Sequence, residues 1–124
     1  MVALFTDDAR MEYPYAPEAD FPAFPKVIEG KDRIRTYYHD AAQYIGEYRY
    51  LDWKEWGCHR LEGTDTYFFA YSARGSVRAT GTDYRQDLFL FARMRGEKVS
   101  FYREFWDPYV ALSTFGLIAV VPPL

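Results

Sequence analysis

The stretch YRQDLFLFARMRGEKVSFYREFW, residues 84–106, decides the fold of this chain. Two runs rich in aromatic and aliphatic residues, 84–94 and 99–106, flank a turn centred on Gly96, which predicts a β-hairpin. With residues 95–98 as the turn, Met94 pairs with Val99. Strand alternation then predicts one face made of Asp87, Phe89, Phe91, Tyr102, Glu104 and Trp106.

The opposite face of the predicted hairpin is apolar as well. It carries Leu88, Leu90, Ala92, Met94, Val99, Phe101 and Phe105. A sheet with one solvated face alternates apolar and polar residues, so here one face should meet helices and the other a partner. We expect a homodimer formed through the face of Leu88, Leu90, Phe101 and Phe105.

Outward from the hairpin, helical spacing gives way to strand spacing along the chain. Residues 30–45 predict a helix, with apolar residues at offsets 0, 3, 4, 7, 8 and 11 from Ile34 and Gly46 as its stop. A short strand at 10–13 and a proline-rich loop at 13–26, which carries Tyr15, Phe21 and Phe24, precede this helix. Strands at 50–61 and 66–74 follow it. This order predicts a single α+β domain over residues 1–124, with helices on one face of an antiparallel sheet.

Composition narrows the function classes. The 124 residues are 49% apolar and 20% aromatic, a content of rings that suits a dense core, an interface or a pocket equally well. With 15 basic and 18 acidic residues there is no basic excess for nucleic acid. No run reaches the roughly 20 apolar residues of a membrane helix, and no signal-peptide pattern is present. We therefore expect a cytoplasmic protein with no nucleic-acid or membrane partner.

Glu104 is the residue best suited to chemistry. Between Tyr102 and Trp106 on one strand face, its carboxyl would lose hydration, which raises the pKa and favours general acid–base work. Asp87 on the same predicted face is the candidate second acid, and Tyr102 a candidate hydroxyl donor. The alternative is that nearby arginines neutralise these carboxyls: Arg85, Arg93 and Arg103.

Metal and cofactor chemistry is not expected. Cys58 is the sole cysteine, and His39 and His59 show no metal-ligand spacing. Glycine-rich phosphate loops and the GxSxG nucleophile motif are both absent from the sequence. We predict no metal and no cofactor.

Several segments resemble a known superfamily. ALFTDDARMEYPYAP (3–17), IEGKDRIRTYY (28–38) and VSFYREFWDPYVALSTFG (99–116) are similar to SnoaL-like, nuclear transport factor 2 (NTF2)-like proteins, which include ketosteroid isomerase and polyketide cyclases. YLDWKEW (50–56) looks most like the phenazine-biosynthesis A/B branch. The resemblance implies a cone of curved antiparallel sheet around helices (a cystatin-like α+β barrel), an apolar pocket, and a dimer across the outer sheet face. It also implies that Glu104 is an acidic pocket residue.

The sequence departs from the family patterns at several positions. Tyr13 stands where the ketosteroid isomerase base would be, and Phe89 matches its second acid. Ala42 and Gly46 stand at the positions of the assisting histidine and serine of the phenazine branch. The family's first long helix is expected to be missing or truncated.

Two functions follow as hypotheses. The first is a cofactor-independent isomerase or cyclase for a small apolar or cyclic ligand, with Glu104 and Asp87 as catalytic residues. Its expected substrate-binding residues are Tyr13, Tyr15, Phe89, Phe91, Tyr102 and Trp106. The alternative is a non-catalytic ligand-binding or dimerisation module of the same fold. An epoxide-opening hydrolase is a weaker third option, which is supported only by the presence of Asp87 with Arg85.

Overall fold

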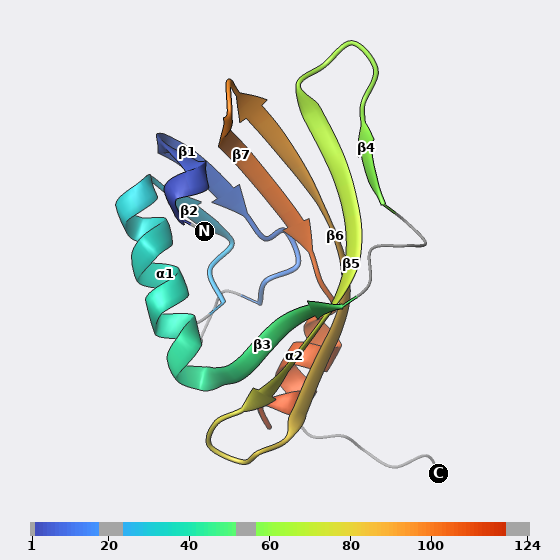
Figure 1. The fold of residues 1–124 in the computed structure, drawn as a ribbon. Helices are drawn as coiled ribbons and strands as arrows, with labels where there is room; N and C mark the ends of the chain where they lie inside the picture. The colour runs from blue at the N-terminus through green and yellow to red at the C-terminus, as the bar shows by residue number, and fades with distance from the viewer. Residues whose placement is uncertain (1, 18–23, 52–56, 119–124) are drawn as a thin grey trace.

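The computed structural model describes residues 2–17, 24–51 and 57–118 (Figure 1). The elements run, in chain order, η1 Val2–Leu4, β1 Phe5–Glu12, β2 Val27–Glu29, α1 Lys31–Tyr44, β3 Ile45–Leu51, β4 Cys58–Arg60, β5 Thr66–Val77, β6 Asp83–Arg95, β7 Lys98–Phe105 and α2 Pro108–Thr114. Among the described helices, none is long and apolar enough to span a membrane.

The strands form one strongly curled sheet in the order β2-β1-β7-β6-β5-β3, and β4 pairs with β5. All pairs are antiparallel except β1 with β7, which is parallel, so the sheet is mixed. Figure 1 shows α1 standing across the hollow side of this sheet, where it contacts β1, β2 and β3. Helix α2 packs on β6 at one end. The predicted α+β cone is confirmed, although its sheet is mixed and not wholly antiparallel as expected.

Helix α1 begins after Gly30, whose φ of 90° suits glycine, and it buries Ile34 completely. The helix predicted over 30–45 is thus confirmed to within one residue at each end. The expected stop at Gly46 is wrong, because the chain is already extended at Ile45 and Gly46 pairs with Ser76 in the sheet.

The predicted strands correspond to β1, β5, β6 and β7, with somewhat different ends. The single strand predicted over 50–61 is instead divided between the end of β3 and β4, and residues 52–56 lie outside the described residues. Most of the segment 50–56 that carried the phenazine resemblance, and Phe21 of the proline-rich loop, also lie outside them.

A β-bulge changes the predicted hairpin register. Met94 pairs with Val99 as expected, but Arg93 then pairs with Phe101, which leaves Ser100 as the extra residue. The Ser100 hydroxyl donates to the Arg93 carbonyl at 3.2 Å and holds the bulge in place. Beyond it, each β7 residue pairs one position away from the expected partner, so Glu104 lies opposite Leu90 rather than Phe89.

This shift exchanges the two faces of β6 relative to those of β7. Leu88 and Leu90 are buried on the hollow side, which the partly buried Tyr102 and Glu104 share. Phe89, Phe101 and Phe105 lie on the outer side. The predicted dimer face of Leu88, Leu90, Phe101 and Phe105 is therefore wrong as a single surface, because a one-residue slip turns every later side chain over.

Candidate active site

Glu104 occupies the centre of the hollow face, held by two strands. Its Oε2 accepts a hydrogen bond from the Tyr102 hydroxyl, two residues earlier on β7. The same oxygen accepts a hydrogen bond from the Tyr71 hydroxyl on β5 at 3.3 Å. Strand β6 lies between β5 and β7, so Tyr71 reaches the carboxyl across β6, whereas Tyr102 is on the same strand as Glu104.

Burial dominates the electrostatics of Glu104. Loss of hydration raises the pKa of its carboxyl from 4.5 to about 7, and the hydrogen bonds from Tyr102 and Tyr71 oppose only part of that rise. Among the described residues no ion pair with Glu104 forms, so the predicted alternative of arginine neutralisation does not apply to it. A carboxyl with a pKa near 7 is present in both forms at neutral pH.

Aromatic rings surround this carboxyl. Tyr13 lies at the centre of the wall, with its ring centroid 6.5 Å from that of Tyr102, 6.4 Å from Trp106 and 5.6 Å from Tyr37. Phe24 extends the wall beyond Trp106 at 5.7 Å. Burial raises the pKa of Tyr13 and Tyr102 well above the ordinary value, so both hydroxyls stay protonated. The rings enclose one side of a cavity of about 1200 Å³ between α1 and the sheet.

A buried glutamine fixes the far end of the cavity. Gln86 Nε2 donates to the Tyr84 hydroxyl at 3.0 Å and to the Asp107 carbonyl at 2.8 Å, and Gln86 Oε1 accepts from the Asp107 backbone N–H at 2.9 Å. Asp107 in turn caps α2 through its side chain, which accepts from the N–H of Tyr109 at 2.9 Å. Trp106, next to Asp107, is thereby held against the cavity wall. Burial raises the pKa of Tyr84 to about 12.

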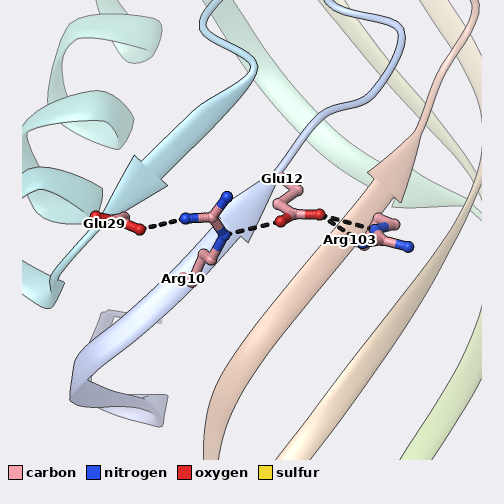
Figure 2. Close-up of polar contacts among 4 residues, drawn as sticks. All are labelled: Arg10, Glu12, Glu29 and Arg103. Carbon is pink, nitrogen blue, oxygen red and sulfur yellow. Dashed lines mark hydrogen bonds and ion pairs between the residues drawn. The ribbon is translucent and has the colours of Figure 1, made fainter.

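The outer face of the same sheet carries a second glutamate, Glu12, in the opposite environment. Figure 2 shows Glu12 of β1 between Arg10 and Arg103. Its carboxylate accepts from Arg10 Nε at 2.8 Å and from Arg103 Nη2 at 2.7 Å, and Arg10 also pairs with Glu29. The Arg10 guanidinium, with Arg103, lowers the pKa of Glu12 below its ordinary value.

Four predicted site residues lie away from the cavity. Asp87 is on the outer face, where it accepts a hydrogen bond from the Ser72 hydroxyl at 2.5 Å. Phe89 is 41% exposed and stacks on Phe105 at 4.9 Å, and Tyr15 packs on the same ring at 5.3 Å. Phe91 packs on Phe68 beside them. The prediction that Asp87 shares a face with Glu104 as a second acid is therefore wrong, and the bulge at Ser100 is the reason.

The other predicted residues do meet: Tyr13, Tyr102, Glu104 and Trp106 all line the cavity. Sequence reasoning missed Tyr71, Tyr84 and Gln86, which line it too. Alternation along β5 and β6, where small or apolar residues such as Ala73 and Leu88 share a face with them, was the available signal.

Metal ligands are not gathered at this site or elsewhere in residues 2–17, 24–51 and 57–118, where no three His, Cys, Asp or Glu side chains could hold an ion together. His39, His59 and Cys58 are exposed, on α1 and β4. The polar side chains that the sheet presents to the cavity include the Glu104 carboxyl, several phenol hydroxyls and Gln86.

Comparison with known proteins identifies the family of this chain. No protein-family model matches it. The uncharacterized protein YesE of Bacillus subtilis is 31% identical over 113 residues, which cover 91% of this chain and 72% of YesE. The chain belongs to the YesE family. The crystal structure of a "Putative Isomerase from Bacillus subtilis" matches this YesE-family chain with a TM-score of 0.78 and 29% identity, over 94% of this chain and 79% of that one.

Two more distant structures share the fold with the YesE-family chain. The phenazine biosynthesis-related protein PhzB2 of Pseudomonas aeruginosa has a TM-score of 0.78 at 16% identity, over 99% of this chain and 72% of PhzB2. A Catenulispora acidiphila protein with a ketosteroid isomerase-like fold, solved in complex with trimethylamine, has a TM-score of 0.74 at 17% identity. The match covers 98% of this chain and 84% of that one. The fold is thus that of NTF2-like and ketosteroid isomerase-like proteins.

Proposed function

We propose that this chain is a cofactor-independent isomerase or cyclase that acts on a small, largely apolar ring compound, with Glu104 as its general acid–base. The observation that carries the proposal is the carboxyl of Glu104 inside an aromatic cavity, held by two tyrosine hydroxyls and without a cationic partner among the described residues. The similarity to the Bacillus subtilis isomerase candidate supports the reaction class. The shared fold with PhzB2 supports a position near the phenazine-biosynthesis branch of the SnoaL-like proteins.

The proposed step is a proton transfer between two carbons of the bound ring. The Glu104 carboxylate takes a proton from carbon, the electron pair of that C–H bond moves into the ring π system, and the carboxylic acid returns the proton at a second carbon. Because the pKa of Glu104 is about 7, both the carboxylate that accepts the proton and the carboxylic acid that returns it are populated at neutral pH. Tyr71 and Tyr102 fix the carboxyl, while Tyr13 and Trp106 bind the ring by packing.

Deuterium exchange tests this role without a known substrate. The protein is incubated in D₂O with a panel of cyclic enones and cyclic β,γ-unsaturated ketones, and deuterium incorporation at carbon is followed by NMR. We expect Glu104→Gln to lower the exchange rate by about 100-fold or more. Glu97→Gln, the same change in the exposed β6–β7 turn, should leave the rate unchanged. An E104Q variant that exchanges as fast as the parent chain would remove Glu104 from the mechanism.

We also propose that two copies associate through the outer aromatic face, now defined as Phe68, Phe89, Phe91, Phe101 and Phe105. Phe89 is 41% exposed although it belongs to a continuous ring cluster. Residues of both charge signs, Asp87 and Arg93, lie on the same face, which suits pairing of one patch with itself. Light scattering after size-exclusion chromatography should give twice the monomer mass, and Phe89→Glu should halve it. Tyr109→Glu on α2 is the control, and a monomeric parent chain would contradict the proposal.

A further inference from the structure

The interior of the cavity carries negative charge without a matching positive group from the described residues. Three residues that line it carry a charged group: Arg33, Asp40 and Glu104. Arg33 and Asp40 are exposed on α1 and have opposite signs, so their charges offset each other at the cavity mouth. Glu104, on the sheet, is therefore the sole charged group in the interior, among the residues that the structure describes.

One carboxyl oxygen of Glu104 is uncommitted. Both tyrosine hydroxyls donate to Oε2, and Oε1 accepts no hydrogen bond from a described residue. Every enclosed side-chain nitrogen or oxygen in the described part of the chain has a hydrogen-bond partner. Oε1 is therefore not enclosed, and it is accessible from the cavity.

The surroundings of Oε1 favour positive charge. Aromatic rings present a negative face, and a tyrosine or tryptophan face attracts an ammonium group within about 6 Å of its centroid. Tyr13, Tyr37, Tyr102 and Trp106 form a continuous wall of such rings beside Glu104. A carboxylate at the base of an aromatic wall is complementary to a small organic cation.

The hydrogen bonds to Glu104 also favour a cationic ligand. Tyr71 and Tyr102 already donate their hydroxyl protons to Glu104, so neither proton is available for a negative oxygen that develops on a ligand. A ligand whose positive nitrogen takes up the electron pair needs no such donor. These two hydroxyls therefore serve the carboxyl and not a ligand oxygen, and a cationic ligand makes no demand on them.

Resting on the function proposed above for this cavity, we propose that the missing counter-ion of Glu104 arrives with the ligand, and that the cavity selects small organic ammonium or iminium ions over neutral molecules of equal shape. For a β,γ-unsaturated iminium ligand the proton transfer balances. The Glu104 carboxylate takes a proton from the α-carbon between C=N⁺ and C=C, the C–H electron pair forms a new C=C bond, and the C=N π pair returns to nitrogen to give a neutral dienamine. The nitrogen lone pair then re-forms C=N⁺ while the γ-carbon takes the proton back from the Glu104 carboxylic acid, which gives the conjugated α,β-unsaturated isomer.

The pH dependence of this selectivity belongs to Glu104. The groups that face it are phenols from every neighbouring element: Tyr13 after β1, Tyr37 and Tyr38 on α1, Tyr71 on β5, Tyr84 on β6 and Tyr102 on β7. Phenols stay neutral well above neutral pH. A cation that binds only the carboxylate form should lose affinity as the pH falls below about 7, up to tenfold per pH unit.

Choline and its uncharged isostere 3,3-dimethylbutan-1-ol are the probes that test the inference, with binding followed by NMR chemical-shift titration. At about pH 8.5 we expect choline to bind at least about tenfold more tightly than the alcohol. At about pH 5.5, and in Glu104→Gln at either pH, the preference should shrink to the part that the aromatic wall alone supplies. Glu97→Gln should keep the full preference.

Equal affinities at the higher pH, a preference undiminished in E104Q, or no binding of choline would each overturn the inference. Bound choline should also lower the Glu104 titration midpoint, by reciprocal linkage. Failure here is distinguishable from failure of the proposed reaction. If neutral ketones exchange deuterium through Glu104 while choline shows no preference, the acid–base role stands and the cation selectivity does not.

Discussion

Glu12 and Glu104 lie on neighbouring strands of one sheet and differ in almost every physical property. Glu12 pairs with Arg103 in the β1–β7 register, and Arg103 immediately precedes Glu104 on β7. It points to the outer face and binds two guanidinium groups (Figure 2), which lower its pKa. Glu104 points to the hollow face, binds two neutral hydroxyls, and has a pKa raised to about 7. Sheet face and the charge of the partners, not residue type, decide which glutamate is suited to acid–base chemistry.

The largest expected effect is that of Glu104→Gln on the free energy of unfolding at high pH. The folded-state pKa of Glu104 is raised from 4.5 to about 7, so folding favours its protonated form. Its stabilising contribution is complete below pH 4.5 and is lost as the pH rises through 7. Glu104→Gln should therefore match the parent chain near pH 4 and exceed it by about 2 kcal/mol at pH 8.5, once solvent screening reduces the full shift.

Urea unfolding at a series of pH values measures this difference. The stabilisation by E104Q should grow between pH 5 and 8 and then level off. A variant that is less stable than the parent chain throughout this range would show that the carboxylate of Glu104 has a favourable partner after all.

A smaller effect is expected from the hydroxyls that hold Glu104. Tyr102→Phe removes a hydrogen bond to the carboxylate, so the Glu104 titration midpoint should rise by about one pH unit. Tyr71→Phe should raise it less, because its hydrogen bond is the longer one at 3.3 Å. Tyr109→Phe, at an exposed position on α2, is the control. A midpoint that falls in Y102F would contradict the assigned donor.

The smallest effect is expected at Glu12. Its depressed pKa gives a stabilising contribution that is present above the ordinary glutamate pKa and is lost as the pH falls through the folded value. Glu12→Gln should cost about 1 kcal/mol at pH 7, with a smaller cost near pH 3 and in 1 M salt, because screening weakens exposed ion pairs. Thermal unfolding at both pH values measures the change, and a cost independent of pH and salt would exclude the ion pairs as its source.

Much of this site was predictable within single strands. Tyr102, Glu104 and Trp106 share a face because alternation along one strand needs no knowledge of its partner. The helix α1 followed from the spacing of Ile34 and the residues after it.

Properties that depend on pairing between strands were not predictable in the same way. Ser100 inserts one residue into β7 without any distinctive sequence, and this moved Asp87 and Phe89 to the opposite face from Glu104. Tyr71 reaches Glu104 across 33 positions of sequence, a contact that no local pattern reports. Helix α2 was available locally, because Asp107 followed by Pro108 is a strong helix start, and it was missed.

The contrast between the two glutamates is tested most directly by the titration of Glu104 itself. Carboxyl ¹³C NMR of glutamate-labelled protein, with the Glu104 signal identified by its loss in E104Q, gives the midpoint. We predict a midpoint near pH 7. A midpoint near 4.5 would mean that this carboxyl is solvated or paired with a cation, and would contradict the acid–base site.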